Sequence, residues 1–305
     1  MLDLSVIIVS YNTRDLLRDC LRSVYRSLGT AGLSAEVLVV DNASRDGSAE
    51  MVRGEFPDAR LIANAENRGF AAANNQALRQ TQGRYLLLLN PDTVVQGDAL
   101  PALARFMDER PKAGVACGRL LYGDGSFQHS CFRFPTLLMS FLDFFPVNHR
   151  ITGSRLNGRY PHSWFERPFP IDHPLGACFI VRREAVEQVG LLDEQFFIYC
   201  EEIDWCIRIK RAGWEAYYTP TATIVHLEGR STQQFRGPML VELHRSRYRL
   251  FRKHYGPAFQ WANRQIVRLG MARHALRDRL RVRQGKLTRA DLQERLATYR
   301  EIWRL

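Results

Sequence analysis

The feature that most constrains the fold is an apolar run that ends on a carboxylate, Tyr85-Leu86-Leu87-Leu88-Leu89-Asn90-Pro91-Asp92. Continuous apolar residues are typical of a strand buried on both faces of a parallel sheet. Proline cannot donate to a sheet ladder, so the strand ends there. Asp92 then lies at the carboxyl edge, where open α/β sheets bind ligands. Two interpretations stay open: a simple turn, or a carboxylate that holds a divalent cation.

Strand-like and helix-like segments alternate along the first 121 residues. We expect strands at 4–9, 36–40, 60–63, 84–89 and 114–121, and helices at 14–28, 69–80 and 98–108. This alternation predicts a mostly parallel, doubly wound α/β sheet, which brings the strand ends to one edge. Four of these ends are polar: Ser10-Tyr11-Asn12, Asp41-Asn42, residues 64–67 and Asn90-Pro91-Asp92. We therefore expect the ligand site at this edge.

The second half of the chain is less regular. Residues 123–170 are predicted to be an irregular segment, and a loop of this length usually has a function. After it we expect a strand at 176–181, helices at 184–189 and 201–211, a strand and turn at 216–226, and basic helices from 239. These segments divide the chain into parts at 1–121, 122–235 and 236–305.

Charge is concentrated near the C-terminus. The net charge is +11, and residues 235–305 hold 18 Lys and Arg against 5 Asp and Glu, or +13, which leaves −2 for the rest. Basic residues interleaved with aromatic residues on helices suit an anionic membrane surface. A helical hairpin that only packs on the body or forms a homodimer is an open alternative. No nucleic-acid partner is expected, since no nucleic-acid-binding module is present.

Cysteines and hydropathy indicate the compartment. Six scattered cysteines without a Cys-x-x-Cys pair, at 20, 117, 131, 178, 200 and 206, are typical of buried, reduced thiols. No stretch approaches the length of a membrane span, and the first residues do not resemble a signal peptide. We expect a cytoplasmic protein, peripheral at the inner face of the cell membrane.

A second acidic cluster lies at Glu201, Glu202 and Asp204. On a helix Asp204 can pair with Arg208, whereas Glu202 projects about 100° from Glu201, so the two glutamates have different roles. The cluster is either an acidic first turn that complements the helix dipole or a general base. The apolar residues 196–199 before it favour a pocket wall, where a raised pKa suits a base. His226, at the end of a strand-like run, is either structural or a cation ligand.

Glycine-rich nucleotide motifs are missing from the first strand–helix turn. There is no G-x-G-x-x-G and no G-x-x-x-x-G-K-[ST], which excludes a dinucleotide dehydrogenase and a P-loop enzyme. Tyr11 offers a ring for stacking, and Asn12 offers an amide. Asp41 can accept from a base N–H or a ribose hydroxyl, or it can hold the turn that follows it.

In this order the motifs resemble glycosyltransferase family 2, the inverting enzymes with a GT-A fold, and within it the rhamnosyltransferase-like branch. The resemblance covers about residues 4–255. It is carried by residues 6–12, 39–48, 66–74, 89–92, 176–178 and 199–206 and by His226.

The resemblance implies roles for individual residues. Residues 1–121 are the half that binds a nucleotide sugar, 122–235 the acceptor-binding and catalytic half, and 236–305 a basic helical extension. Asp92 matches the last acid of the family's Asp-x-Asp motif and ligates Mg2+ or Mn2+ with help from His226. Glu202 matches the catalytic base, one methylene longer than the family's Asp, with Glu201 as the alternative. The implied donor-binding residues are Ser10, Tyr11, Asn12, Asp41, Asn67, Arg68, Asn74, Asn90, Gly176 and Ala177.

The implied activity is inverting transfer of one sugar from a nucleotide sugar to a glycan or lipid-linked acceptor in bacterial cell-surface polysaccharide synthesis. dTDP-rhamnose is the first expected donor and a UDP-sugar the next. Single transfer is expected because Gln233-Gln234-Phe235-Arg236-Gly237 departs from the Gln-x-x-Arg-Trp of processive members. The alternatives are a sugar-1-phosphate nucleotidyltransferase and a non-catalytic nucleotide-sugar-binding protein.

Overall fold

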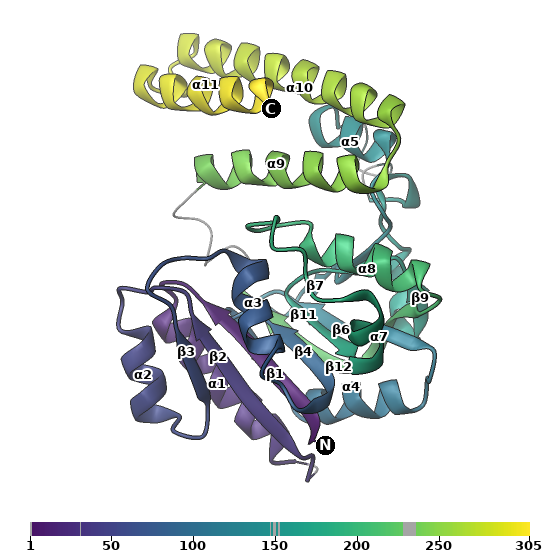
Figure 1. The fold of residues 1–305 in the computed structure, drawn as a ribbon. Coiled ribbons are helices and arrows are strands. Elements are labelled where there is room, and N and C mark those ends of the chain that lie inside the picture. The colour runs from purple at the N-terminus through teal and green to yellow at the C-terminus, as the bar shows by residue number, and fades with distance from the viewer. Residues whose placement is uncertain (1, 31, 147, 149–150, 152, 228–235) are drawn as a thin grey trace. The chain divides into compact units, whose positions relative to one another are not determined.

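The computed structural model describes residues 2–30, 32–146, 148, 151, 153–227 and 236–305. It divides into two compact units. The α/β unit comprises Met1–Arg133, Tyr160–Phe197 and Glu201–Ser231, and the helical unit comprises Phe134–Arg159, Ile198–Cys200 and Thr232–Leu305. Figure 1 shows the sheet of the first unit and the long helices of the second.

The α/β unit is built on one mixed sheet with the order β3-β2-β1-β4-β11-β6-β12-β5 (Figure 1). The pairs β3–β2, β2–β1, β1–β4 and β12–β6 are parallel. The strands are β1 (Leu2–Ser10), β2 (Ala35–Asp41), β3 (Arg60–Ala63), β4 (Gly83–Leu89), β5 (Thr93–Val95), β6 (Ala113–Leu121), β11 (Cys178–Arg182) and β12 (Glu215–His226). The predicted mostly parallel α/β sheet is confirmed.

The apolar run is buried on both faces, as the sequence predicts: residues 85–89 are each at most 2% exposed. One face of the sheet joins a core with α1 (Arg14–Leu28) and α4 (Ala99–Asp108). α3 (Phe70–Leu78) contacts β1 and β2, and α7 (Arg183–Val189) contacts β4. The unit also contains α2 (Ser48–Glu55) and α8 (Glu201–Arg211).

Four details differ from the sequence-based expectations. β11 runs antiparallel to both β4 and β6, and the direction of an apolar strand cannot be read from its sequence. Helix α2 and the three-residue strand β5 were not predicted. The segment 123–170 is not simply irregular: it contains β7 (Phe127–Gln128), β8 (Cys131–Phe132), α5 (Leu137–Phe144), η1 (Arg155–Asn157), η2 (His162–Glu166) and β9 (Phe169–Ile171), and β10 (His173–Pro174) follows it. β8 pairs with β10 and β9 with β12, which are distant in the sequence, whereas β7 forms a hairpin with the adjacent strand β6.

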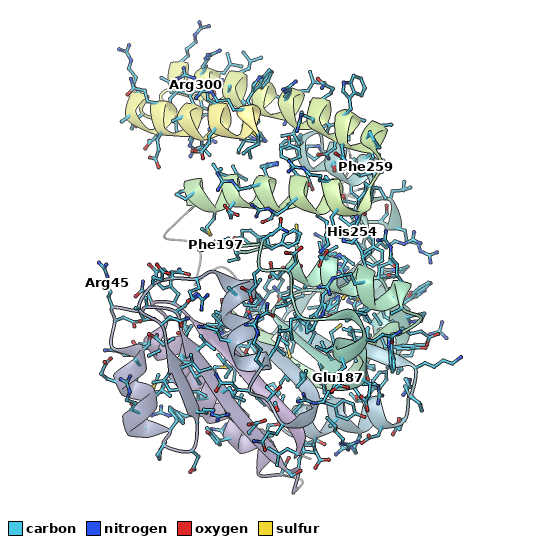
Figure 2. The ribbon with its side chains drawn as sticks, in the orientation of Figure 1. Arg45, Glu187, Phe197, His254, Phe259 and Arg300 are labelled. Carbon is cyan, nitrogen blue, oxygen red and sulfur yellow. The ribbon has the colours of Figure 1, made fainter. Side chains whose placement is uncertain are left out.

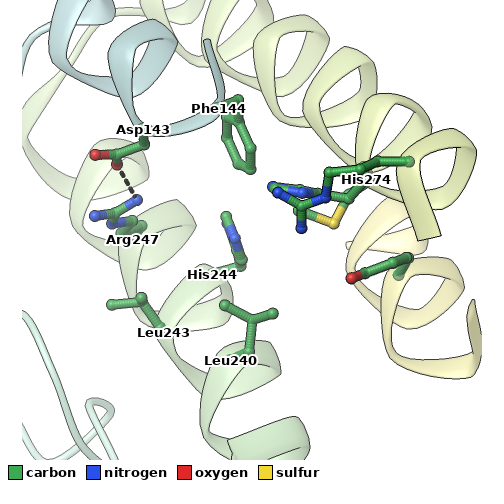
Figure 3. Close-up of a pocket in the computed structure, with 10 residues that line it drawn as sticks. Asp143, Phe144, Leu240, Leu243, His244, Arg247 and His274 are labelled. Carbon is green, nitrogen blue, oxygen red and sulfur yellow. Dashed lines mark hydrogen bonds and ion pairs between the residues drawn. The ribbon is translucent and has the colours of Figure 1, made fainter. Parts of the chain in front are cut away.

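The helical unit consists of α5, α9 (Arg236–His254), α10 (Pro257–Arg283) and α11 (Arg289–Arg304), which confirms basic helices in the C-terminal segment. A small core contains Phe144, Val241, Val267, Met271 and Ile302. Beside it lies a pocket of about 350 Å³. Figure 3 shows this pocket, with the 2.8 Å ion pair between Asp143 and Arg247 on one side.

The burial of the cysteines agrees with the sequence analysis. All six cysteines are buried and none forms a disulfide. Within the part of the chain that the structure describes, no helix combines the length and the apolar character needed to cross a bilayer.

We predict that Gly83→Ala destabilises the α/β unit. A Cβ at Gly83 would lie 2.5 Å from the Ser5 backbone nitrogen and 2.7 Å from the Leu4 carbonyl carbon, so β4 must move away from β1. The expected loss in the free energy of unfolding is about 1–3 kcal/mol, measured by urea unfolding. Gly54→Ala in α2 is the control, because nothing lies within 4 Å of its Cβ position, and a helical alanine is expected to stabilise by about 0.5–1 kcal/mol. Equal effects of the two substitutions would contradict the close approach of the strands.

Candidate active site

The ends of β2 and β3 are joined by the side chain of Asn42, which is 2% exposed. Its Nδ2 donates to Asn67 Oδ1 at 2.8 Å and to Gly69 O at 3.3 Å. Its Oδ1 accepts from Asn64 Nδ2 and from the Arg68 amide, both at 3.0 Å. The hydrogen-bonding capacity of the amide is thus fully used to hold the loop between β3 and α3.

Gly69 ends that loop in a conformation that excludes a side chain. Its φ is +79°, and a Cβ would lie 2.5 Å from the Phe197 carbonyl oxygen. The next amide, of Phe70, donates to the same oxygen at 2.6 Å. Both contacts fix the loop that carries Asn67 and Arg68.

The end of β1 is tied to the loop after β2. The Asn12 amide donates to Ser44 Oγ at 2.9 Å, and Asn12 Oδ1 accepts from the Arg45 amide at 2.8 Å. The fully buried hydroxyl of Ser10 lies 2.8 Å from that of Thr13. Tyr11, between Ser10 and Asn12, is half-buried. The strand ends are therefore organised by bonds between loops that lie far apart in the sequence.

Asp41 serves the turn with one oxygen and keeps the other for a ligand. Oδ2 accepts from the Ser44 amide at 3.2 Å, which confirms the turn interpretation in part. Oδ1 is buried and makes no hydrogen bond with any described residue. A buried acceptor without a partner is costly, and a donor group on a ligand would satisfy it.

Asp92 lies beside His226 at the other side of the same edge. Asp92 Oδ1 and His226 Nε2 are 3.5 Å apart, and the two residues are 1% and 6% exposed. The pairing of β5 with β12 places Thr93 opposite His226, and the Leu227 amide donates to Asp92 O at 2.9 Å.

Gln128 of β7 orients the ring of His226. Its Oε1 lies 3.1 Å from His226 Nδ1, and both side chains are buried. An amide oxygen only accepts, so Nδ1 is the donor in this contact, and Nε2 is the nitrogen that faces Asp92. A carboxylate oxygen and an imidazole nitrogen at this distance could hold a shared cation.

Glu201 and Glu202 begin α8, and they differ in burial. Glu201 is 4% exposed and Glu202 is half-buried. A Cβ at Gly176 would lie 3.8 Å from Glu202 Cδ, so the missing side chain leaves room beside this carboxylate. The backbone before the pair is in the left-handed region at Tyr199 and Cys200, with φ of 70° and 68°. Such conformations in residues with side chains concentrate at functional sites.

The acidic pair shares its charge unequally. Burial raises the pKa of Glu201 well above the ordinary value of 4.5, and the neighbouring charge of Glu202 raises this pKa further. Two carboxylates in one site cannot both ionise easily. Burial therefore favours the protonated form of Glu201. Asp204 is paired with Arg208 at 2.8 Å, as its spacing predicts.

Of the remaining candidates, Asn74 and Asn90 make hydrogen bonds within the protein. Asn74 Nδ2 donates to Phe70 O at 2.9 Å in its own helix. The Asn90 amide donates to Ala177 O at 2.8 Å and extends the β4–β11 ladder, so it links the Asp92 side of the edge to the Gly176 side. Arg68 is exposed. Residues 233–235, which belong to the segment compared with the Gln-x-x-Arg-Trp motif of processive members, lie outside the described residues.

Two residues of the site were not among the sequence candidates. Gln128 lies in the segment predicted as irregular, where no pattern links it to His226. Asn42 follows Asp41 in a recognised polar strand end, and that position was its only signal. Among the described residues no group of three or more His, Cys, Asp and Glu side chains is arranged to hold a metal. Asp92 and His226 form a pair rather than such a group.

Comparison with known proteins identifies the class. The profile of Glycosyl transferase family 2 matches residues 5–190. N-acetylglucosaminyl-diphospho-decaprenol L-rhamnosyltransferase of Mycobacterium tuberculosis is 30% identical over 261 residues, 80% of this chain and 82% of that protein. Rhamnosyltransferase WbbL of Escherichia coli is 26% identical over 178 residues, 55% of this chain and 64% of its own length.

The fold has solved counterparts. The mannosyltransferase PcManGT of Pyrobaculum calidifontis, solved with GDP-Man and Mn2+, superimposes with a TM-score of 0.56 at 19% identity, over 99% of this chain and 87% of that one. The fold is therefore that of the GT-A glycosyltransferases. This chain belongs to glycosyltransferase family 2, and it is a rhamnosyltransferase-like glycosyltransferase.

The buried carboxyl of Glu201 predicts a pH-dependent cost in stability. Below about pH 4.5, its ordinary pKa, the Glu201 carboxyl is protonated in both the folded and the unfolded chain. As pH rises, the unfolded chain ionises first, so the folded state loses stability until pH passes the raised pKa. We expect Glu201→Gln to be more stable than the unaltered protein, with a gain that grows from about pH 5 to about pH 8. Urea unfolding at both pH values measures this gain in stability. The control is Glu184→Gln, at an exposed position of α7. A gain independent of pH would show that Glu201 is not buried with a raised pKa.

Proposed function

We propose that this chain is an inverting, metal-dependent glycosyltransferase that moves one sugar from a nucleotide-sugar donor to a hydroxyl of a glycan or lipid-linked acceptor. The first proposed donor is dTDP-rhamnose and the next a UDP-sugar, in the synthesis of bacterial cell-surface polysaccharides. The facing of Asp92 Oδ1 and His226 Nε2 at the edge of a family 2 glycosyltransferase sheet carries the proposal. The names of the two rhamnosyltransferase relatives support the donor.

The proposed metal is Mg2+ or Mn2+, held by Asp92 and His226. Asn90 stands at the position of the first acid of the family's Asp-x-Asp motif, so Asp92 is the one carboxylate that this chain has in the motif. A set of few protein ligands suits a cation that also binds the diphosphate of the substrate. When bound, the cation neutralises charge that develops on the departing nucleoside diphosphate. The mannosyltransferase PcManGT, a structural neighbour solved with GDP-Man and Mn2+, supports this assignment through its fold.

The donor is proposed to bind along the ends of β1, β2 and β3. The free Oδ1 of Asp41 suits a base N–H or a ribose hydroxyl, and the Tyr11 ring suits stacking on the base. Asn67 and Arg68 contribute from the loop that Asn42 holds. Ser10, Asn12, Asn74 and Asn90 hold this edge through their internal bonds, and Gly176 and Ala177 line the sugar side.

Glu202 is proposed as the general base. Its carboxylate is half-buried and lies beside the open space at Gly176, whereas Glu201 is buried and its pKa is raised, which favours its protonated form. Glu202 accepts the proton of the acceptor hydroxyl, and the hydroxyl oxygen bonds to the anomeric carbon. The bond from that carbon to the diphosphate oxygen breaks with its electron pair leaving on the diphosphate. One such displacement inverts the anomeric configuration.

Other parts of the expectation remain predictions. These are the cytoplasmic location at the inner face of the cell membrane, a homodimer, transfer of a single sugar and the division at residues 121 and 235. Membership of family 2 favours sugar transfer over the nucleotidyltransferase alternative.

Glu202→Gln is expected to lower kcat for sugar transfer at least about 100-fold, because a positioned base contributes this much or more. Donor affinity, measured by calorimetry, should change little. Glu201→Gln is the matched control and should retain transfer. Loss of transfer in Glu201→Gln alone would move the base to Glu201, and donor binding without transfer in the unaltered protein would favour a non-catalytic binder.

Asp92→Asn is expected to abolish metal-dependent donor binding. For the unaltered protein, a nucleotide sugar at roughly 100 times its Kd with Mn2+ should stabilise the folded state by about 2.7 kcal/mol. A thermal-shift panel of dTDP-rhamnose and UDP-sugars, with Mn2+ or with EDTA, measures this and identifies the donor. Asp58→Asn, an exposed aspartate before β3, should respond like the unaltered protein. No shift with any donor would overturn the proposed function.

A further inference from the structure

Helix α10 has an apolar outer face that no other part of the helical unit covers. Its inner face is formed by Asn263, Val267, Gly270, Met271 and Asp278, which are buried. On the opposite side Trp261, Leu269, Leu276 and Leu280 are 67%, 62%, 59% and 45% exposed. At 3.6 residues per turn these four side chains fall within an arc of about 100°. We call them, together with Arg279 and Arg283, the α10 outer face.

The exposed fractions show which apolar and aromatic side chains of the basic C-terminal segment are available to a partner. Other apolar residues of the segment are used inside the unit: Leu250 and Phe251 are at most 1% exposed, and Phe251 packs against Tyr255 and Phe259. The outer face is thus not an average property of a basic tail. It is a single stripe on a helix of 27 residues, about 40 Å long.

Two arginines of the stripe have no polar partner among the residues that the structure describes. Arg279 and Arg283 are exposed, and their guanidinium groups make no ion pair or hydrogen bond with a described residue. On the neighbouring helix, Trp303 is 45% exposed and lies under Arg268, whose Cζ is 5.8 Å from its ring. Long nitrogen-tipped side chains project from α10 and α11 into open space in Figure 2. The outer face therefore combines apolar area with positive charge available to a partner.

We propose that the α10 outer face docks on the surface of an anionic phospholipid bilayer. Leucine side chains enter the boundary between headgroups and acyl chains, tryptophan favours the same depth, and arginines bind lipid phosphates. The balance of 18 basic and 5 acidic residues over 235–305 is complementary to such a surface.

The same observations disfavour two other occupants. A symmetric dimer through this face would bring the arginines of both copies into one interface, since a two-fold interface joins identical patches. Nucleic acid would neutralise the arginines but would leave the leucine stripe without an apolar partner. Only a surface that is both anionic and apolar within a few ångströms of depth satisfies both halves of the face.

The experiment is vesicle flotation with the full chain. Vesicles of phosphatidylcholine alone are compared with vesicles of equimolar phosphatidylcholine and phosphatidylglycerol. We expect binding to the anionic vesicles and little to the neutral ones. The assay contains no donor and no acceptor, so its outcome is independent of the proposed sugar transfer.

Two pairs of variants test the two halves of the face. Leu269→Gln with Leu276→Gln is expected to reduce binding roughly tenfold or more, whereas Leu156→Gln in η1, 57% exposed, should not. Arg279→Glu with Arg283→Glu is expected to reduce binding roughly tenfold or more, whereas Arg53→Glu with Arg105→Glu should not. The side chains of these two control arginines are 58% and 56% exposed in the α/β unit. Circular dichroism confirms that each variant is folded.

A fluorescence measurement places Trp261 directly. Anionic vesicles should shift the tryptophan emission to shorter wavelength, and Trp261→Phe should reduce this shift while binding is kept. Equal binding of the variants and their controls, or no binding to anionic vesicles at low salt, would overturn the proposal. A dimer that Leu269→Gln with Leu276→Gln disperses, without vesicle binding, would assign the face to a second copy, and RNA binding alone would assign it to nucleic acid.

Discussion

The candidate active site depends on the pairing of β5 with β12. β5 is only three residues long, and its register sets Thr93 opposite His226. That register brings Asp92, at the end of the buried strand β4, to 3.5 Å from an imidazole 134 residues away in the sequence. β12 is also held by its parallel pairing with β6, so the central sheet itself positions the histidine. A slip of one residue in either pairing would turn His226 to the other face of the sheet.

A second constraint is the charge that each side of the edge can hold. On one side, His226, oriented by Gln128, faces the single carboxylate of Asp92, and the two groups could hold a divalent cation. On the other side, burial and the charge of Glu202 raise the pKa of Glu201. The hydrogen bond from the Asn90 amide to Ala177 O links these two sides of the edge.

In the helical unit, the basic composition does not determine which side chains the surface exposes. One core cluster of the unit contains five buried apolar residues, and Leu250 and Phe251 are buried as well, yet α10 leaves four large apolar side chains exposed on the side away from that cluster. Within the unit's pocket, burial lowers the pKa of His244 to about 3, whereas Arg279 and Arg283 are exposed. A basic composition alone does not distinguish these two environments.

The sequence by itself determined the local features: the buried strand of residues 85–89, the polar ends of β1 to β4, the acidic start of α8 and its Asp204–Arg208 pair. Each of these follows from periodicity, turn chemistry or spacing within a few residues. Only the tertiary structure decided the direction of β11, the existence of β5, the contact of Gln128 with His226, the unequal burial of Glu201 and Glu202, and the face of α10 that stays exposed. These features depend on pairing and burial between segments far apart in the chain, and neither leaves a pattern in neighbouring residues.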